Sequence, residues 1–590
     1  MPIAPTFTQA FQNTVAAHPH NLALSNPDDT VRLTWRQYGA RVRSLAEGLA
    51  SLGVARGETV GLMLTNRVEF HLVDTATLHA GGTPFSIYNT LAPEQIAHLF
   101  SNAGNRVVVC EAQFLPQIHA ATAAGDTAVE HIVCLDDAPA GTIPFAELEA
   151  RTVDGFDFEA SWRAVEPDDV LTIIYTSGTT GPSKGVELTH ANLMAELSST
   201  LPVSNPGPGD VIISYLPDAH IANRWGAHYT SIASGMQIVA LPDMKQMIAV
   251  LPNARPTLFG AVPQVWYKLK AGIEAQLAAE KSPVKKKLAA WAFDVGRRRA
   301  RLRSDGAPVP RGLAMQAELA DKIVFSTVRA KLGLDRVRFA ATGAAAIDPE
   351  ALEFVLALGL PCCEIWGMSE LSCAATVNPP DAIRIGTVGK ALPNAELRIA
   401  EDGELLVRGP LVMKGYRNEP EKTADTIDAE GWLHTGDIAS IDADGYVRIV
   451  DRKKELMINA AGKNMSPANI EGTIKVSSPL VGSAVAIGDD RPYVVALITL
   501  DPDAAAAFAQ QHGLPDSSPK ALADAPAVRA ALDEAVAAAN QRLSRVEQIK
   551  KFAILPDVWE PGGDEVTPTM KLKRRPIAGK YADRIEELYR

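Results

Sequence analysis

The sequence predicts an α/β protein of several domains, and three observations lead to this fold class. The chain has 590 residues, enough for about three or four domain-sized cores. Its first part alternates helical spacing with short apolar runs, which is typical of doubly wound layers with parallel strands. From Gly386 the pattern changes to short alternating strands with close turns, which indicates a small antiparallel, barrel-like subdomain.

The composition is that of a globular protein, with 47% hydrophobic and 21% charged residues. The net charge of -12 argues against a general affinity for nucleic acid. The five cysteines form no CxxC pair, which favours a reducing compartment without structural zinc. The N-terminus has no secretory pattern, and no stretch is apolar for the length of a membrane span. We therefore expect a cytoplasmic protein, with peripheral contact at the inner membrane face left open.

Residues 1–165 form the first predicted α/β layer. Within it, residues 44–52 have helical spacing, while residues 59–63 and 106–110 are short apolar runs expected to be buried strands. Residues 166–385 form the second predicted layer, which carries the most informative part of the sequence.

A stretch rich in glycine and hydroxyl residues occupies positions 175–185, YTSGTTGPSKG. It follows a predicted buried strand at 170–174 and precedes residues 186–197, which have helical spacing with Thr189 as a candidate N-cap. Glycines let backbone N–H groups turn inward, hydroxyls add donors or metal ligands, and a lysine adds charge, so the stretch predicts phosphate binding. A flexible surface turn is the alternative, and Gly185 after the lysine excludes a Walker A loop. The candidate ligands are Thr176, Ser177, Gly178, Thr179, Thr180, Gly181 and Lys184.

This stretch resembles the phosphate-binding signature of the adenylate-forming (AMP-binding) synthetases, which include acyl-CoA ligases, luciferases and peptide-synthetase adenylation domains. The resemblance covers nearly the whole chain, with the motifs in family order. It implies a large adenylating domain at residues 1–451, whose β subdomain is 386–451, and a mobile α+β domain at 452–590. It also implies a hinge near 452–454, at Lys454.

Two segments resemble the acyl-binding part of the family. Residues 216–220 (LPDAH) match a segment whose histidine lies by the carboxyl group that is activated, which implies this catalytic role for His220. Trp225 is expected to border the acyl pocket. Residues 259–266 (FGAVPQVW) match the segment that lines the acyl site. The residues implied there are Gly260, Ala261 and Val262.

The nucleotide site is implied by two further segments. Residues 339–344 (FAATGA) resemble a strand and turn against which the nucleotide lies, and Ala344 stands where relatives often have a second glycine. In residues 364–370 (EIWGMSE), Trp366 is expected to stack on adenine, Ser369 to hydrogen-bond the α-phosphate, and Glu370 to hold Mg²⁺ together with Thr179. The nucleotide-binding residues implied here are Gly343, Ala344, Glu364, Ile365, Trp366, Gly367, Met368 and Ser369.

Residues 430–454 (EGWLHTGDIASIDADGYVRIVDRKK) closely resemble the signature segment of fatty acyl-CoA synthetases. Asp437 is expected to accept both ribose hydroxyls, since a fixed carboxylate suits a vicinal diol. Arg452 is expected near the ribose and phosphate, and Ile449 completes the implied nucleotide contacts.

The C-terminal domain carries two implied sites. In the loop of Ala461, Gly462 and Lys463, which the resemblance places beside the CoA tunnel, the first residue replaces the usual glycine. Near the C-terminus, TPTMKLKR resembles the loop whose lysine bridges the carboxylate and the α-phosphate. Alignment to the family pattern selects Lys571 for this catalytic role, with Lys573 as the alternative.

A long helical stretch rich in basic residues spans 268–334. Lys285–Lys287 and Arg297–Arg299 flank an apolar stripe of Leu288, Trp291, Ala292 and Val295. We favour a solvated helix with this stripe in the core, and contact with an anionic membrane or with CoA phosphates is the alternative. A helical insertion here resembles the long-chain synthetases, which is the main ground for a long-chain substrate.

Together these motifs predict an ATP-dependent long-chain fatty acid–CoA ligase that uses ATP, Mg²⁺ and CoA. It would form acyl-AMP with release of pyrophosphate and then pass the acyl group to CoA. An acyl-AMP ligase that loads a carrier protein and a catalytically silent acyl- or nucleotide-binding protein are the alternatives. A homodimer is also considered.

Overall fold

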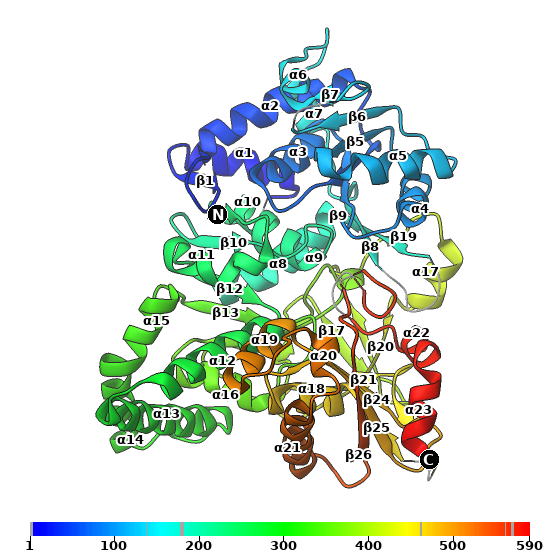
Figure 1. Ribbon diagram of the computed structural model, residues 1–590. Coiled ribbons are helices and arrows are strands. Elements are labelled where there is room, and N and C mark those ends of the chain that lie inside the picture. Colours follow the sequence, from blue (N-terminus) through cyan, green and yellow to red (C-terminus); the bar gives the residue numbers. More distant parts are fainter. Residues whose placement is uncertain (1–3, 137–138, 177–181, 461–462, 561, 568–570) are drawn as a thin grey trace.

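The computed structural model describes residues 4–136, 139–176, 182–460, 463–560, 562–567 and 571–590. Figure 1 shows the first layer at the top, the second layer below it, and the C-terminal segment packed beneath and in front. The predicted mixed α/β fold with parallel sheets is confirmed. No helix in the described part of the chain is long and apolar enough to cross a bilayer.

The first layer is a parallel five-stranded sheet in the order β4-β3-β5-β6-β7. Its β3 matches the predicted strand at 59–63. The helix predicted at 44–52 begins earlier, at Trp35, because Thr34 and Gln37 form a capping box there. The bounds are α1 Phe7–Ala17, α2 Trp35–Ser51, β3 Thr59–Met63, α3 Val68–His79, β4 Thr83–Ser86, α4 Pro93–Ala103, β5 Val107–Cys110, α5 Leu115–Ala124, β6 His131–Cys134, β7 Ile143–Pro144, α6 Phe145–Ala150 and α7 Phe158–Arg163.

The phosphate stretch joins two antiparallel strands, β8 (Val170–Thr176) and β9 (Lys184–Thr189). Residues 186–189, at the start of the stretch with helical spacing, belong to β9 and pair with β8. Thr189 is nevertheless the N-cap of the following helix, α8 (His190–Ser204), as predicted. A third short strand, β19 (Gly415–Tyr416), pairs with β9.

The second layer contains two sheets. One has the order β12-β13-β14-β15-β16, and the other has the order β10-β11-β1-β2, so the N-terminal strands β1 and β2 lie in this layer. The bounds are β1 Leu22–Ser25, β2 Arg32–Thr34, β10 Val211–Ser214, α9 Ile221–Asn223, α10 Thr230–Ser234, β11 Gln237–Ala240, α11 Met247–Ala254, β12 Leu258–Ala261, β13 Phe339–Thr342, α16 Pro349–Ala357, β14 Cys362–Trp366, β15 Thr376–Val377 and β16 Lys390–Ala391.

A helical insertion and an antiparallel subdomain complete the large unit. In Figure 1, α13 and α14 project from the second layer at the lower left. The subdomain sheet has the order β17-β18-β20-β21, all antiparallel. The bounds are α12 Pro263–Ala279, α13 Pro283–Ser304, α14 Arg311–Ala320, α15 Ser326–Leu332, β17 Glu396–Ile399, β18 Glu404–Arg408, α17 Pro420–Thr426, β20 Leu433–Ile441 and β21 Val447–Arg452.

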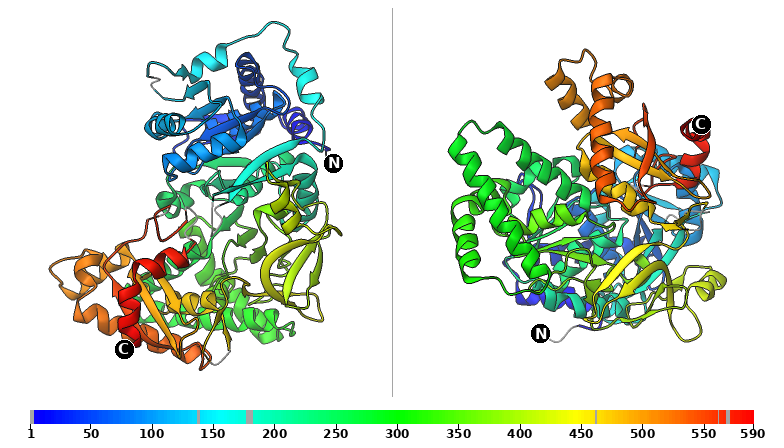
Figure 2. Two further views of the ribbon diagram at one scale, coloured as in Figure 1. Left: turned by 90° about the vertical axis from the view of Figure 1, so that its right-hand side faces the viewer. Right: turned by 90° about the horizontal axis from the view of Figure 1, so that it is seen from below.

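The C-terminal segment has its own apolar core, formed from residues between Met457 and Ile585. Its main sheet is β24-β25-β26, and the two further views separate it clearly from the large unit (Figure 2). The bounds are β22 Met457–Ile458, β23 Asn464–Met465, α18 Pro467–Ser477, β24 Val481–Ile487, β25 Val494–Leu500, α19 Pro502–His512, α20 Pro519–Leu522, α21 Pro526–Arg542, β26 Ile549–Leu555, α22 Arg574–Lys580 and α23 Ala582–Tyr589.

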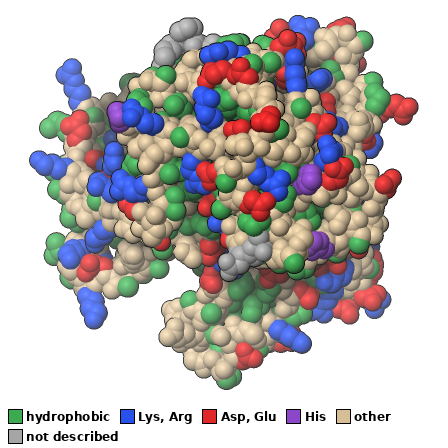
Figure 3. Space-filling view, turned by 90° about the horizontal axis from the view of Figure 1, so that it is seen from above, with side chains coloured by type: hydrophobic (Ala, Val, Ile, Leu, Met, Phe, Trp, Pro, Cys, Tyr) green, Lys and Arg blue, Asp and Glu red, His purple; other side chains and the backbone are tan. Residues whose placement is uncertain are grey.

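The face seen from above in Figure 3 carries lysine, arginine and acidic side chains interspersed with apolar ones. A nucleic-acid backbone binds best to a surface of one positive sign. This face carries charges of both signs, and the whole chain has a net charge of -12. Neither observation supports a nucleic-acid site on this face.

Candidate active site

The hairpin β8–β9 positions the two ends of the predicted phosphate loop. Thr176 and Lys184 are paired across the two strands. The Lys184 ammonium lies over the ring of Tyr416, 4.4 Å from its centre. The other predicted loop ligands, Ser177, Gly178, Thr179, Thr180 and Gly181, lie outside the described residues.

Glu370 contacts the same tyrosine. The Tyr416 hydroxyl donates a hydrogen bond of 2.8 Å to Oε1 of Glu370, whose side chain is buried. Burial and the neighbouring Glu370 charge raise the pKa of Tyr416, so the phenol stays a donor. No hydrogen bond or ion pair joins Oε2 of Glu370 to a described residue.

A single carboxylate is a suitable ligand for Mg²⁺. It is too few ligands for a metal that is bound by protein side chains alone. The described residues contain no cluster of three or more histidine, cysteine or acidic side chains that could hold a metal. Mg²⁺ usually takes one or two carboxylates and fills its other positions with water and substrate phosphates. Glu370, with one oxygen held by Tyr416, fits that pattern.

Asp437 joins two other predicted residues. Its Oδ2 accepts a 2.8 Å hydrogen bond from the Trp366 indole, and its Oδ1 is 2.8 Å from Arg452 Nε. Asp437 and Arg452 are opposite each other on β20 and β21, which explains their contact. Burial raises the pKa of Asp437, against the lowering effect of Arg452, Trp366 and Lys571. Each carboxylate oxygen can accept a second hydrogen bond, so ribose hydroxyls remain acceptable ligands.

Lys571, in the C-terminal segment, is electrostatically coupled to Asp437, Arg452 and Glu370. Loss of solvation lowers its pKa, and Arg452 lowers it further, whereas Asp437 and Glu370 raise it. Its side chain keeps exposed surface, and its backbone N–H donates to Thr567 Oγ1 at 3.0 Å. The alternative, Lys573, instead donates from Nζ to the Gly563 carbonyl at 2.8 Å. Lys571 therefore lies within electrostatic reach of Asp437 and Glu370, whereas the Lys573 ammonium has a contact within the C-terminal segment.

His220 lies within electrostatic reach of Lys571. Its Nδ1 accepts a 3.1 Å hydrogen bond from the Ala222 backbone N–H at the start of α9. Burial, aided by the positive charge of Lys571, lowers the pKa of His220 to about 4. The ring is therefore neutral near pH 7, with its hydrogen on Nε2. A neutral Nε2–H is a suitable donor to a substrate carboxylate.

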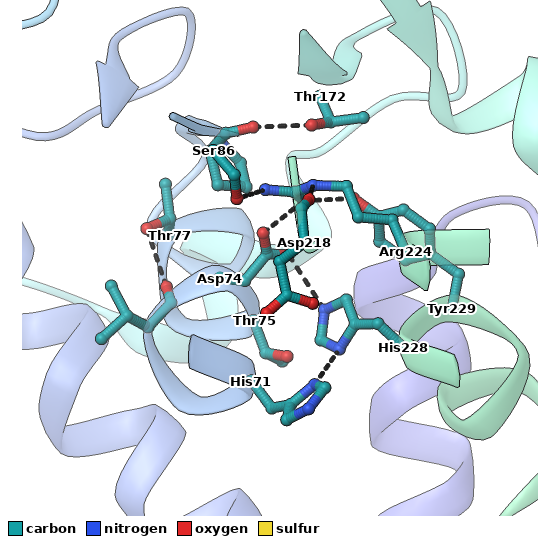
Figure 4. A network of polar contacts seen from close by, with 12 residues as sticks. His71, Asp74, Thr75, Thr77, Ser86, Thr172, Asp218, Arg224, His228 and Tyr229 are labelled. Atoms are coloured by element: carbon teal, nitrogen blue, oxygen red, sulfur yellow. Dashed lines mark hydrogen bonds and ion pairs between the residues drawn. The ribbon is translucent and has the colours of Figure 1, made fainter. Parts of the chain in front are cut away.

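The sequence did not reveal a buried polar network around Arg224 and Asp74, which is drawn in Figure 4. Arg224 lies in the same segment as His220 and Trp225. The fully buried Arg224 guanidinium forms an ion pair with Asp74 of α3 and donates to Ser86 Oγ of β4 at 2.9 Å. Its Nε donates to the Asp218 carbonyl at 3.0 Å. The signal available in the sequence was a charged residue within an otherwise apolar run.

Within this network, the negative charge of Asp74 is offset by the positive charge of Arg224. Burial opposes ionisation of Asp74, but the Arg224 charge and His228 outweigh it and lower the pKa of Asp74. His228 Nε2 is 3.0 Å from Asp74 Oδ1, and its Nδ1 is 3.0 Å from Nδ1 of His71. Burial, followed by the nearby His228, lowers the pKa of His71 well below its usual value. A paired arginine therefore joins α3 of the first layer to the helical segment between β10 and β11 of the second.

The predicted acyl-binding residues lie on β12, at the start of α12, and in the helical segment that follows α9. Gly260 and Ala261 end β12, and Val262 is the N-cap of α12. A Cβ atom added at Gly260 would meet nothing within 4 Å, so open space lies beside this glycine. Trp225 is half-buried and lies near Glu196 of α8, whose pKa is raised well above its usual value by burial.

The predicted nucleotide residues, called the nucleotide wall below, lie on β13, β14 and β21 and in the segments that follow β13 and β14. Gly343 and Ala344 follow β13, and Ala344 has φ +67°, a left-handed conformation that favours glycine. At Gly367, a Cβ atom would lie 1.9 Å from the Cys373 carbonyl oxygen, so only glycine fits. Glu364 is buried, which raises its pKa to about 8. The wall also contains Ile365 and Trp366 of β14, Met368, Ser369 and the half-buried Ile449 of β21.

The predicted hinge and CoA loop lie beside one another in sequence. β21 ends at Arg452, and Lys454 follows in an exposed turn. Ala461 and Gly462 lie outside the described residues. Lys463 is exposed, and its backbone N–H donates to Asn459 Oδ1 at 2.9 Å.

The family model for AMP-binding enzymes matches residues 11–417, and the model for the AMP-binding enzyme C-terminal domain matches residues 454–590. The chain therefore belongs to the AMP-binding enzyme family. Among curated relatives, the Mycobacterium tuberculosis protein provisionally named as fatty-acid–CoA ligase fadD11 is 54% identical over 76% of this chain and 79% of its own. Long-chain-fatty-acid–CoA ligase ACSBG2 of Xenopus laevis is 33% identical over 99% of this chain and 84% of its own.

The solved structures share the fold over their whole length. The anthranilate CoA ligase AuaEII in complex with anthranoyl-AMP has a TM-score of 0.75 at 20% identity, covering 99% of both chains. A fatty acyl CoA synthetase of Mycobacterium tuberculosis has a TM-score of 0.62 at 22% identity, covering 98% of this chain and 99% of that chain. At these identities the likeness shows the fold alone.

Proposed function

We propose that the protein is an ATP-dependent ligase that activates a long-chain fatty acid as acyl-AMP and transfers the acyl group to CoA. One observation carries the proposal: Lys571 of the C-terminal segment lies within electrostatic reach of Glu370, Asp437 and His220 of the large unit. The names of relatives that are 33% identical over nearly the full chain support the fatty-acid substrate and CoA.

In the first half-reaction, a carboxylate oxygen of the acid attacks the α-phosphorus of ATP, the bond to the β-phosphate oxygen breaks, and pyrophosphate leaves. His220 Nε2–H orients the carboxylate, and Lys571 offsets the negative charge gathered on the two reacting groups. Asp437 holds the ribose, and Lys184 braces the leaving phosphates. Mg²⁺, when bound at Glu370 and Thr179, supplies further neutralisation of phosphate charge.

In the second half-reaction, the CoA sulfur forms a bond to the acyl carbon, AMP leaves, and the thiol proton passes to solvent. We propose that the C-terminal domain turns about Lys454 to admit CoA beside the loop of Ala461, Gly462 and Lys463. The separate core of this domain and the exposed turn at Lys454 support such a rotation.

The decisive experiment is acid-dependent exchange of labelled pyrophosphate into ATP with fatty acids of increasing chain length, followed by addition of CoA. We expect exchange that is greatest with long chains, and acyl-CoA once CoA is present. Exchange without acyl-CoA would favour the carrier-loading alternative, in which Ala461 becomes the residue of interest. No exchange with any acid would contradict the proposal and favour the binding protein.

We further propose that the helical insertion contacts an anionic membrane surface. Met315, Leu319 and Ile323 are 71%, 51% and 42% exposed and, four residues apart, share one helix face. Residues 281–332 contain 13 lysine and arginine residues against 4 acidic ones, although the whole chain is acidic. Exposed apolar side chains among basic ones suit the boundary of an anionic bilayer. The homodimer stays a prediction, which light scattering would test.

A further inference from the structure

One hydrogen-bonded ion pair joins the C-terminal domain to the large domain away from the hinge. Arg542, the last residue of α21, forms a hydrogen-bonded ion pair with Asp348 and lies 3.6 Å from Glu350. Lys268 and Asp503 form a looser, exposed contact at 3.7 Å. Within the described residues, no other hydrogen-bonded ion pair connects residues 1–450 with 463–590.

Contacts within the large domain fix the position of Asp348 independently of Arg542. Its Oδ1 caps α16 by accepting from the backbone N–H groups of Glu350 and Ala351 at 2.8 and 3.1 Å. Its own N–H donates to the Tyr267 hydroxyl at 2.9 Å. The Asp348 side chain is 4% exposed, whereas that of Arg542 is 35% exposed. A fixed carboxylate therefore meets an arginine that water can reach, and the contact can open without uncapping α16.

The contact is anchored beside the nucleotide wall. Asp348 follows Gly343 by five residues, at the end of the turn that leaves β13. The Tyr267 hydroxyl accepts the hydrogen bond from the Asp348 backbone and lies near Glu364 of β14. Burial raises the pKa of Tyr267 most, and the charges of Asp348 and Glu364 raise it further. Arg542 therefore binds the end of the segment against which the nucleotide is proposed to lie.

We propose that Arg542 is a positioning residue for adenylation, which holds the C-terminal domain in the orientation that brings Lys571 to Glu370, Asp437 and His220. This inference rests on the proposed two-step function. A contact that exists in one orientation stabilises that orientation only, so its loss shifts the population away from the adenylating state. The side chain touches no reacting atom, and its effect is on how often Lys571 is in place.

The test compares the two half-reactions in R542A, R542K and the control K268A. In R542A we expect acid-dependent pyrophosphate exchange to slow about five- to tenfold, as for loss of one charge-assisted contact. Transfer from preformed acyl-adenylate to CoA should keep its rate or become faster. R542K should recover part of the exchange rate because an ammonium group can still pair with Asp348. K268A should match the wild type in both steps, since its contact is exposed.

Equal slowing of both half-reactions in R542A, or no slowing of exchange, would overturn the proposal. A second measurement does not depend on activity: the distance between spin labels at exposed positions in the two domains should become longer or more widely distributed in R542A but not in K268A. An unchanged distance distribution in R542A would also overturn the proposal. A wild-type protein without exchange would contradict the proposed function, while the distance measurement would still decide whether Arg542 holds the domains together.

Discussion

At the scale of single residues, the candidate site combines charged groups from distant parts of the chain that lie within electrostatic reach of Lys571. Lys571 has acidic neighbours in Asp437 and Glu370 and a basic neighbour in Arg452. Loss of solvation disfavours its charge, so a negatively charged substrate would be the partner that offsets this cost. The arrangement suits a lysine that acts when carboxylate and phosphate are both present.

Lys571→Ala should therefore slow adenylation about 10²- to 10³-fold, as for loss of one preorganised charge at a transition state. Preformed acyl-adenylate should still react with CoA, because the charge is needed only in the first step. Single-turnover measurements of each half-reaction would check this result. Lys573→Ala is the matched control, with Nζ bound to the Gly563 carbonyl, and it should affect adenylation far less. A similar loss in both half-reactions of Lys571→Ala would contradict its assignment.

A second prediction at this scale concerns pH and stability. Burial raises the pKa of Glu364 from its usual 4.5 to about 8 in the folded protein. The folded state then binds more protons than the unfolded state between these values, so this carboxyl stabilises the fold at low pH and loses that contribution as pH rises through about 8. Glu364→Gln removes this dependence.

The melting temperature of Glu364→Gln relative to wild type should therefore rise steadily from pH 5 to pH 8. Thermal melts at one scan rate, in buffers of equal ionic strength, would measure the difference. A difference that stays constant over this range would show that Glu364 titrates near its ordinary pKa.

At the scale of elements, the helical segment between β10 and β11, which contains α9 and α10, depends on contacts from the first layer. Arg224 binds the backbone at Asp218 on one side of His220 and the Tyr229 hydroxyl, 3.1 Å away, on the other. Its partner Asp74 belongs to α3, so the packing of two layers sets the position of one short segment. We infer that this buried pair keeps His220 and Trp225 in place for the acid.

Arg224→Lys keeps the charge but loses the planar fork that binds several acceptors at once. We expect the KM for fatty acid to rise about five- to tenfold while the KM for ATP changes little, because the nucleotide wall lies on other elements. Steady-state kinetics with each substrate varied would check this.

Tyr38→Phe is the control, since it removes hydrogen bonds to Thr75 and to the His71 carbonyl but makes no change in the segment that carries His220 and Arg224. It should lower the melting temperature and leave both KM values unchanged. Equal increases in the two KM values of Arg224→Lys would indicate a general loss of structure.

At the scale of the whole molecule, the helical insertion stands away from the site and gives the protein a basic, partly apolar projection. Ala292 and Val295 of the predicted stripe are buried, so that part of the stripe is core as favoured from the sequence. The exposed apolar face instead belongs to Met315, Leu319 and Ile323.

Replacing Met315 and Leu319 together by glutamate should weaken binding to vesicles of mixed anionic and zwitterionic lipid about tenfold or more, because apolar burial is lost and charge is reversed. Co-sedimentation at low and physiological salt would measure this. Replacing the exposed Val153 by glutamate is a control far away in sequence and should have little effect. Wild-type protein that does not sediment with such vesicles would contradict the membrane contact.

The sequence by itself determined the family and the fold class, and it supplied the residues proposed for the site. Local chemistry suffices for these: the run of glycine and hydroxyl residues at 175–185 predicts phosphate binding, and Thr189 was correctly expected to begin a helix. The family models bear out the resemblance that these motifs indicated. Hydrophobic spacing also gave β3 its correct bounds.

Only the tertiary structure decided which polar groups face each other. Strand β9 was not predicted, because it forms by pairing with β8 and β19 although its residues 186–189 have helical spacing. The Asp74–Arg224 pair lies 150 positions apart in sequence, and Arg542 meets Asp348 across 194 positions. Sequence spacing carries no information about such contacts, because they depend on how separately formed layers and domains pack together.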